Sequence, residues 1–381
     1  MPSLKKIDGA PLQNVEVLHV VPRGFGGAGG VFGGAERYVH ELARFMARPT
    51  PTRIVTFGDE SGDWEDGPLQ IRVLGKPWLV RGQYHNPFSL KVIKEVRRSA
   101  IIHCHQQHVL LSSFLALLGR LLRKKVFVTE LGGGGWDVSA YLSTDNWYRG
   151  HLHISEYSRR IFKQAEMPRS HVIYGGVDRE KFYPAGEFSP DGPILYVGRL
   201  LPHKGVDYLV EATPPDMPLK VVGKPLDSSF MDHLRTLALG KRVEFLHEVE
   251  DGELVRIYQS ASCIVLPSVY RTRFGKSSKV PELLGQTLLE GMACAIPAIC
   301  TDVASMPEVV DHGTTGFVVP PNDPAALGER LRWLDANPGE AGRMGRAGYR
   351  RVIEKFDWEQ VVQTCFRIYG ISPHGGVSDL R

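Results

Sequence analysis

Residues 194–212 read ILYVGRLLPHKGVDYLVEA. The first four are apolar and predict a buried strand, whereas the last seven place apolar residues at helical spacing and predict a helix. The loop between them, residues 198–205, carries Arg199 and Lys204 at the carboxyl end of the strand. Ligands of open α/β sheets bind at that end, so this unit predicts both a fold and the place of a site.

The two cations of this loop are suited to an anion. Arg199 offers a planar fork to phosphate oxygens and Lys204 a point charge, and they stand five residues apart. A solvated turn without a ligand explains the same spacing equally well. The loop by itself therefore leaves both interpretations open.

The alternation of strand and helix patterns continues on both sides of this unit. Further strands of the second half are predicted at 219–222, 243–246, 263–266, 298–300 and 316–319, with helices at 230–239, 253–260, 288–293, 324–334, 341–356 and 358–369. In the first half, strands are predicted at 15–21, 53–57, 70–74, 100–103 and 126–129, with helices at 35–46, 90–98 and 110–122.

Residues 174–191 separate the two halves and are rich in glycine, proline and charge, which is typical of a linker. We therefore predict an α/β protein of two Rossmann-like, doubly wound parallel-sheet domains, 1–184 and 185–357, that face each other across a cleft. A ligand is expected in that cleft, because both sheets would direct their carboxyl ends toward it.

Composition excludes several classes of protein. The 381 residues are 43% hydrophobic and 23% charged, as in globular chains, and the net charge of +4 gives no case for nucleic acid. The longest apolar run, 109–122, is too short to span a bilayer, and residues 1–13 lack the apolar core of a secretory signal. Five cysteines form no Cys-x-x-Cys pair, so we expect a reduced, cytoplasmic protein without structural zinc.

A glycine-rich segment follows the first strand. Residues 24–29 read GFGGAG and match Gly-x-Gly-x-x-Gly, but the first acid after the next strand, Asp59, lies 30 residues beyond Gly29. A dinucleotide site places that acid about 20 residues on, so a nicotinamide or flavin site is not favoured. Two interpretations remain. One is a flexible loop that leads into the N-terminus of the helix beginning near Gly34, where free amides and the helix dipole favour an anion; the other is a turn without a ligand.

Residues 281–293 read PELLGQTLLEGMA. Gly285 is suited to begin a helix and to expose the first helix amides to phosphate. Glu290 lies at the edge of an apolar helix, where a hydroxyl-rich ligand would compensate its burial unless the side chain lies in water. Glu282 and Glu290 do not fit a glycosidase pair, since a continuous helix would separate them by ~12 Å and glycosidase carboxyls stand at most ~9.5 Å apart.

Six motifs along nearly the whole chain belong together. They are GGAER (33–37), HCH (103–105), VIYGGVDREKFYP (172–184), YVGRLLPHKG (196–205), ELLGQTLLEGMA (282–293) and GTTGFVVPPNDP (313–324). This set resembles glycosyltransferase family 4, whose members are retaining enzymes of the GT-B fold. The pair of glutamates separated by seven residues, combined with the upstream Gly-Arg and Lys-Gly, is its most specific part.

The resemblance implies a role for each matching residue. Arg199 and Lys204 would bind the diphosphate of a nucleotide-sugar, and Glu290 would hold the ribose hydroxyls. Glu282 and His105 would contact the donor sugar, so that His105, Glu282, Arg199 and Lys204 form the catalytic set. Further donor contacts would come from Gly33, Gly34, Gly285, Gln286, Thr287 and Leu288. No Asp-x-Asp occurs in the chain, so neither a metal nor another cofactor is expected.

The family's last helix crosses back to the N-terminal domain, and residues 358–381 would do so here. Two loops depart from the family pattern. Residues 129–131, which read TEL, and the glycines 132–135 stand where Thr-x-His-Gly is usual, which makes Gly133 and Gly134 candidate acceptor contacts. Trp136 is a further candidate as a sugar-stacking platform, although a packed core residue is the more ordinary interpretation. His108 is an alternative to His105.

The second departure is the long loop between Ser268 and Glu282. Its thirteen residues include Arg271, Arg273, Lys276 and Lys279 and contain no acid. We hypothesise that Arg271, Arg273 and Lys276 contact an anionic acceptor or a charged donor sugar. The alternative is a solvated loop without a ligand.

A basic cluster ends the predicted helix 110–122. It consists of Arg120, Arg123, Lys124 and Lys125. Such a cluster fits a weak peripheral contact with an anionic membrane surface. Solvated cations that complement the helix C-terminus are the more ordinary interpretation.

We therefore predict transfer of a hexosyl group from a UDP- or GDP-linked sugar to a hydroxyl acceptor, which is a glycan, a lipid-linked molecule or a small molecule. Retention and metal independence are implied by the resemblance. The alternatives are an epimerase or hydrolase on the same fold, a phosphorylase, and a non-catalytic nucleotide-sugar binder. An epimerase would give product without an added alcohol, and a phosphorylase would require phosphate.

Overall fold

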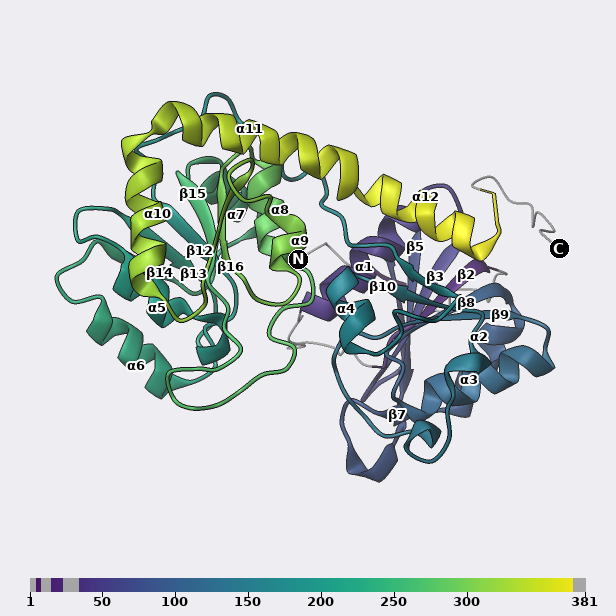
Figure 1. The fold of residues 1–381 in the computed structure, drawn as a ribbon. Coiled ribbons are helices and arrows are strands. Elements are labelled where there is room, and N and C mark those ends of the chain that lie inside the picture. The colour runs from purple at the N-terminus through teal and green to yellow at the C-terminus, as the bar shows by residue number, and fades with distance from the viewer. Residues whose placement is uncertain (1–4, 8–14, 23–33, 373–381) are drawn as a thin grey trace. The chain divides into compact units, whose positions relative to one another are not determined.

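The computed structural model describes residues 5–7, 15–22 and 34–372, and the chain divides into two compact units (Figure 1). The N-terminal unit contains the described residues up to Gly175 and those from Trp358 onward, and the C-terminal unit contains Gly176–Asp357. The predicted boundary at 184 is therefore too late. The reason is that Val177 pairs with the end of the C-terminal unit, where its amide donates to Phe356 O (2.8 Å).

The C-terminal unit is built on a six-stranded parallel sheet. Its strands, in order across the sheet, are β14 (Val243–Leu246), β13 (Leu219–Val222), β12 (Ile194–Val197), β15 (Cys263–Leu266), β16 (Ala298–Thr301) and β17 (Gly316–Val319). The chain starts in the centre with β12, moves outward to β14, and begins the other half at β15. Loops that leave two such central strands diverge, and ligands bind between them at the carboxyl ends.

Helices cover both faces of this sheet (Figure 1). Because crossovers between parallel strands are right-handed, the two halves place their connecting helices on opposite faces. The helices are η5 (Pro202–Lys204), α5 (Val206–Ala212), α6 (Ser228–Leu237), α7 (Asp251–Gln259), α8 (Gln286–Ala293), α9 (Met306–Val309), α10 (Pro324–Ala336) and α11 (Pro338–Lys355). α10 packs on α5 and α11 packs on α8, which completes the two layers.

The N-terminal unit contains a nine-stranded sheet. In order, its strands are β1 (Lys5–Ile7), β4 (Gly62–Asp66), β5 (Leu69–Gly75), β3 (Thr52–Gly58), β2 (Val15–Val20), β8 (Ser99–His105), β9 (Lys125–Thr129), β10 (Gly150–His153) and β11 (Ser170–Val172). β4 pairs antiparallel with β1 on one side and with β5 on the other. The seven strands β5, β3, β2, β8, β9, β10 and β11 are parallel to their neighbours. This parallel part repeats the winding of the other sheet, with β2 and β8 as its central pair.

The helices of the N-terminal unit include the last one of the chain. They are α1 (Gly34–Ala47), η1 (Val80–Gly82), η2 (Leu90–Val92), α2 (Ile93–Arg97), α3 (Leu110–Leu121), η3 (Val138–Ala140), η4 (Asp145–Trp147), α4 (Glu156–Ile161) and α12 (Trp358–Tyr369), and a short hairpin pairs β6 (Trp78–Leu79) with β7 (Pro87–Phe88). α12 packs on α1, where buried Trp358 contacts the rings of Tyr38 and Phe45 at 5.4 and 6.3 Å between centroids. The last helix thus belongs to the N-terminal unit.

Apolar runs in the sequence predicted the core strands, but they did not predict the strands that contain polar residues. β10 and β11 contain three histidines among seven residues, so no apolar run marks them, yet His151 and His153 are buried. The predicted helix 90–98 is two short pieces, η2 and α2. In the described part of the chain, no helix combines the length and apolar character needed to cross a bilayer.

Candidate active site

Lys204 and Glu282 meet at the carboxyl edge of the C-terminal sheet. Lys204 Nζ donates to Glu282 Oε2 at 2.7 Å and to the backbone oxygen of Pro281 at 3.0 Å. The loops that follow the central strands touch beside this pair. Gly205 has φ +69°, and a Cβ there would lie 1.9 Å from the oxygen of Pro267, so only glycine fits this approach.

The charges of these loops act on one another. Burial acts to raise the pKa of Glu282, but the Lys204 ammonium outweighs it, so that pKa lies below its ordinary value. Burial, followed by the charges of Lys204 and Arg199, lowers the pKa of His203 to about 4. Arg199 is exposed, and the hydroxyl of Tyr196 fixes its backbone by donating to Arg199 O at 3.0 Å. The loop after β12 is therefore electropositive.

The N-terminus of α8 lies next to Glu282. Gly285 has φ +84°, a conformation that favours glycine, and its amide donates to Glu282 Oε1 at 3.3 Å. The Gln286 side chain donates to the oxygen of Gly176 at 2.9 Å and so fixes the start of the helix. Within the described residues, the backbone amides of Gln286 and Thr287 have no hydrogen-bond acceptor. An anion at this end would meet free amides and the helix dipole.

Glu290 occupies the interior of the same unit. It is fully buried on α8, and Tyr258 on α7 donates its hydroxyl to Glu290 Oε2 at 2.7 Å. The ring of Tyr258 in turn packs edge-on against Phe182. The alternative of a glutamate in water is therefore wrong. No continuous helix joins Glu282 to Glu290 either, because α8 begins only at Gln286.

The basic loop after β15 is tied to α5. Arg273 forms ion pairs with buried Asp207, at 3.3 Å, and with Glu211, and its guanidinium lies 4.7 Å from the ring centre of Tyr208. Burial raises the pKa of Asp207, and the charge of Arg273 opposes that effect. Arg273 thus anchors the loop. The other two predicted contacts in this loop, Arg271 and Lys276, are exposed.

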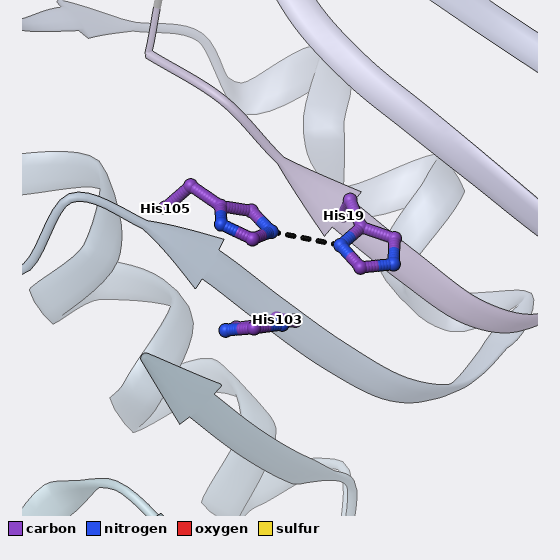
Figure 2. Close-up of side chains that lie close together, drawn as sticks. All are labelled: His19, His103 and His105. Carbon is purple, nitrogen blue, oxygen red and sulfur yellow. Dashed lines mark hydrogen bonds between the residues drawn. The ribbon is translucent and has the colours of Figure 1, made fainter. Parts of the chain in front are cut away.

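Three histidines gather on the central strands of the N-terminal sheet (Figure 2). His19 on β2 lies beside His103 on β8 in the strand register, and His105 ends β8. His19 Nδ1 and His105 Nε2 are 2.7 Å apart, and His19 Nε2 lies 3.4 Å from Met46 Sδ on α1. All three imidazoles are buried, so the cluster belongs to the core of the unit.

His103 is bonded on both sides of its ring. Its Nε2 is 2.8 Å from Thr129 Oγ1 and its Nδ1 is 2.8 Å from the hydroxyl of Tyr369 on α12. These two contacts fix the ring of His103 within the packed core of the unit.

Burial lowers the pKa of His19 to about 3 and the pKa values of His103 and His105 well below their ordinary value. The three side chains are thus neutral at physiological pH. Their nitrogens lie within 4.8 Å of one another, which makes them the group of described residues able to hold a metal ion. Neutral imidazoles suit zinc and similar metals.

A pocket of about 180 Å³ opens at the carboxyl end of these strands. His105, Gly133 and Gly134 line it, together with the first turn of α1 that follows Gly34. Gln106, the residue after His105, has φ +141°, a strained conformation for a residue other than glycine. Its side chain donates to Gly134 O at 2.9 Å and accepts from Gly133 N at 3.3 Å. These two hydrogen bonds hold the loop of glycines 132–135 against the end of β8.

The side chain of Glu130 binds backbone amides next to this pocket. Its buried carboxylate accepts from the amides of Gln107 at 2.9 Å, Gly132 at 2.8 Å and His108 at 3.4 Å. These three hydrogen bonds hold the backbone on both sides of the pocket in place. Trp136 is partly exposed and lies against the guanidinium of Arg81 at 4.0 Å, so it is not a packed core residue.

Both halves of the chain match family models. Residues 32–181 match the model described as Glycosyltransferase Family 4, and residues 178–351 match that of the glycosyl transferases group 1. The chain belongs to glycosyltransferase family 4. It is therefore an enzyme of glycosyl transfer with a two-domain, Rossmann-like GT-B fold.

Curated relatives are similar to part or most of this glycosyltransferase, and solved structures are similar to most of it. It is 28% identical over 388 residues to alpha-maltose-1-phosphate synthase of Mycobacterium tuberculosis, covering 89% of this chain and 95% of that protein. It is 34% identical over 167 residues to the D-rhamnosyltransferase WbpZ of Pseudomonas aeruginosa, covering 43% and 41%. Sucrose-phosphate synthase from Thermosynechococcus elongatus superimposes with a TM-score of 0.69 at 21% identity, and Anabaena Alr3699/HepE in complex with UDP and glucose with 0.69 at 18%; each covers 93% of this chain and 98% of the other.

The structure of this glycosyltransferase groups most of the predicted site residues within their own units. Lys204, Glu282 and Gly285 are joined by hydrogen bonds, and His105, Gly133 and Gly134 share one pocket. Leu288 is buried and packs behind Gly285. The glycine motif 24–29 and Gly33 lie outside the described residues. Sequence reasoning missed His19, Gln106 and Tyr258; a histidine within the apolar run VLHVV was the available signal for the first.

Proposed function

We propose that this glycosyltransferase moves a hexosyl group from a UDP- or GDP-linked sugar to a hydroxyl acceptor, with retention and without a metal ion. The observation that carries the proposal is the Lys204–Glu282 pair beside the N-terminus of α8. It assembles an ammonium, a carboxylate and free helix amides at the central strands of one sheet, where open α/β sheets bind ligands.

The cations and amides would serve the leaving group. As the glycosyl bond breaks, negative charge grows on the diphosphate, and fixed donors aimed at that charge stabilise the transition state most. An ammonium has three N–H donors, of which Lys204 uses two, for Glu282 and Pro281. Its third donor, the exposed Arg199 guanidinium and the amides at the start of α8 are the groups that would receive the diphosphate.

The reaction proposed balances without a protein nucleophile. The bond from C1 of the sugar to the diphosphate oxygen breaks, and the acceptor oxygen bonds to C1 on the same face. The acceptor proton passes to the leaving phosphate. Glu282 is held by Lys204 and by the amide of Gly285, and its oxygens would accept hydrogen bonds from the sugar hydroxyls.

The remaining groups would position the two substrates. Glu290 would accept hydrogen bonds from the ribose, and a ribose hydroxyl there would join or replace that of Tyr258. His105 would contact the donor sugar from the pocket of the N-terminal unit, and Gly133 and Gly134 would let acceptor backbone or sugar approach closely. The relative in complex with UDP and glucose supports a nucleotide-sugar donor.

Isothermal titration of the full chain with UDP, GDP and ADP, followed by transfer assays with the matching nucleotide-sugars, tests the proposal. We expect one nucleoside diphosphate to bind clearly best and its sugar to be transferred only when a hydroxyl acceptor is present, with the anomeric configuration kept. EDTA is expected to leave the rate unchanged. Product formed without an added alcohol would indicate an epimerase or hydrolase, and binding without turnover a non-catalytic protein; either outcome contradicts the proposal.

A further inference from the structure

We propose that His19 is a positioning residue that fixes the tautomer of His105, so that His105 presents an unprotonated Nδ1 as a hydrogen-bond acceptor to a substrate hydroxyl. This inference rests on the proposed function, in which His105 contacts the transferred sugar.

Met46 determines where His19 carries its proton. His19 is neutral, since burial lowers its pKa to about 3, and a neutral imidazole has one N–H and one lone pair. Its Nε2 lies 3.4 Å from Met46 Sδ, and a thioether sulfur can accept a hydrogen bond but has no proton to donate. The proton of His19 is therefore on Nε2, and its Nδ1 holds the lone pair.

His19 then determines where His105 carries its proton. His105 Nε2 lies 2.7 Å from His19 Nδ1, so one of these nitrogens must donate, and His19 Nδ1 cannot. His105 Nε2 is thus protonated and, because burial also keeps this ring neutral, His105 Nδ1 is a bare acceptor. The dashed line in Figure 2 marks this bond between the two rings.

The Nδ1 atom of His105 is buried and has no hydrogen-bond partner within the described residues. A buried acceptor left in that state costs about 1–3 kcal/mol, so it favours a ligand that brings a donor. His105 lines the pocket at the end of β8, which is where a ligand would enter.

The neighbouring His103 differs from His105, because both of its ring nitrogens have a hydrogen-bond partner. His103 Nδ1 and Nε2 each face a hydroxyl, of Tyr369 and Thr129, and a hydroxyl can either donate or accept. Either tautomer of His103 is therefore satisfied, and neither of its nitrogens remains for a substrate. Its ring packs 4.1 Å from that of His105 between centroids and supports it.

A shared metal ion fits this geometry less well than a hydrogen bond. Two imidazole nitrogens on one tetrahedral zinc stand about 3.3 Å apart. The separation of 2.7 Å between His19 and His105 is that of a hydrogen bond. Both nitrogens of His103 are also engaged by hydroxyls.

The fixed tautomer has a consequence for the donor sugar. A hydroxyl at His105 Nδ1 can donate a hydrogen bond, whereas a carboxylate or a methyl group at that point has no suitable proton. Sites built to bond a hydroxyl discriminate strongly against analogues without it. We therefore expect a hexose with a free hydroxyl to be preferred over the corresponding uronic acid or deoxy sugar.

Histidine tautomers measured by NMR in ¹⁵N-histidine-labelled protein, without substrate, test the inference directly. We expect His105 to be protonated on Nε2 alone in the wild type. His19→Asn keeps an acceptor close to the position of Nδ1, and we expect it to preserve this state. His19→Leu removes the acceptor, so the proton of His105 should distribute over both nitrogens.

The kinetic readout uses the same pair of variants. Loss of one oriented hydrogen bond of about 1.4 kcal/mol lowers kcat about tenfold, which we expect for His19→Leu. The affinity for the nucleoside diphosphate should stay unchanged, because His105 faces the sugar. His19→Asn should keep kcat within about threefold of the wild type. This split between kcat and binding separates positioning from a loss of folding.

Several outcomes would overturn the inference. They are a wild-type His105 protonated on Nδ1, equal kcat for His19→Asn and His19→Leu, and a stoichiometric metal ion in the purified protein that is lost in His19→Leu. If His19→Leu does not fold, the tautomer of His105 measured by NMR in the wild type and in His19→Asn still tests the inference. The tautomer is measured without substrate, so an absence of transfer in the nucleotide-sugar assays would remove the proposed function and leave this result standing.

Discussion

The central strands β2 and β8 of the N-terminal unit and β12 and β15 of the C-terminal unit hold equivalent places in two sheets wound in the same order. The first pair presents neutral histidines within the strands, and the second presents an ion pair on the loops beyond them. Burial accounts for this difference. The three histidines inside the strands are buried without an anionic partner among the described residues and are neutral, whereas Lys204 and Glu282 keep 12% and 17% exposure and pair with each other. One topology thus supports a charged site suited to phosphate and an uncharged one suited to hydroxyls.

The largest effect is expected from removing the charge of the C-terminal site. Lys204→Ala should lower kcat at least ~10²-fold, the scale of a lost stabiliser of developing charge. Lys220→Ala is the matched control, because partly exposed Lys220 pairs with exposed Glu244 on the neighbouring strand at 3.5 Å. Steady-state kinetics of both variants check this. Normal turnover of Lys204→Ala would remove the lysine from the mechanism.

Glu290 should affect binding more than turnover. Glu290→Gln keeps the shape of a fully buried side chain but removes its charge, and we expect the donor KM to rise about tenfold with a smaller change in kcat. Tyr258→Phe keeps the ring but removes the hydrogen bond to Glu290 Oε2, and it should lower the free energy of unfolding by about 1 kcal/mol. A donor KM unchanged in Glu290→Gln would exclude the ribose role.

Acid should destabilise the N-terminal unit through its histidines. The pKa of His19 is lowered from 6.5 to about 3, so below pH 6.5 the unfolded chain binds a proton that the folded chain does not. The contribution of neutral His19 to the free energy of unfolding is complete above pH 6.5. It is lost as the pH falls toward 3, at up to ~1.4 kcal/mol per pH unit.

Hydrogen exchange at pH 7 and pH 5, resolved over the two units, measures this. The C-terminal unit contains partly buried His203, whose pKa is lowered to about 4, and should respond less. His19→Leu should reduce the pH dependence of the N-terminal unit. Equal acid sensitivity of the two units would contradict the contrast between them.

The smallest effect is expected from the loop after β15. Arg271 and Lys276 are exposed, so the double variant Arg271→Ser, Lys276→Ser should raise the KM of an anionic acceptor or charged donor sugar only about threefold, and less at high salt. Arg273→Ala should instead lower stability, since it leaves buried Asp207 without its cation. Unchanged kinetics of the double variant would indicate that Arg271 and Lys276 are solvated and contact neither substrate.

Much of the fold followed from local patterns. The apolar runs of β2, β8 and β12–β17 and the helical spacing of α5 or α12 are signals that a few residues carry by themselves. β10 and β11 did not follow, because buried histidines carry no apolar signal. The domain boundary was placed too late, because the pairing of Val177 near the end of the unit is a contact over a long sequence separation.

The candidate site divides in the same way. Lys204, Glu282 and Gly285 were predicted by motif spacing, and their hydrogen bonds then joined them. The partner of Glu290 could not be predicted, because Tyr258 comes from a different helix, 32 residues earlier in the chain. The same holds for His19, which strand pairing brings beside His103 and His105 across more than 80 residues.

A crystal structure with the nucleoside diphosphate that titration selects tests the central claim most directly. The account predicts diphosphate oxygens within hydrogen-bond distance of Arg199 and Lys204 Nζ, with the amides of Gln286 or Thr287 on the distal phosphate. A nucleotide bound elsewhere, with Lys204 still closed on Glu282 and Arg199 in solvent, would contradict it.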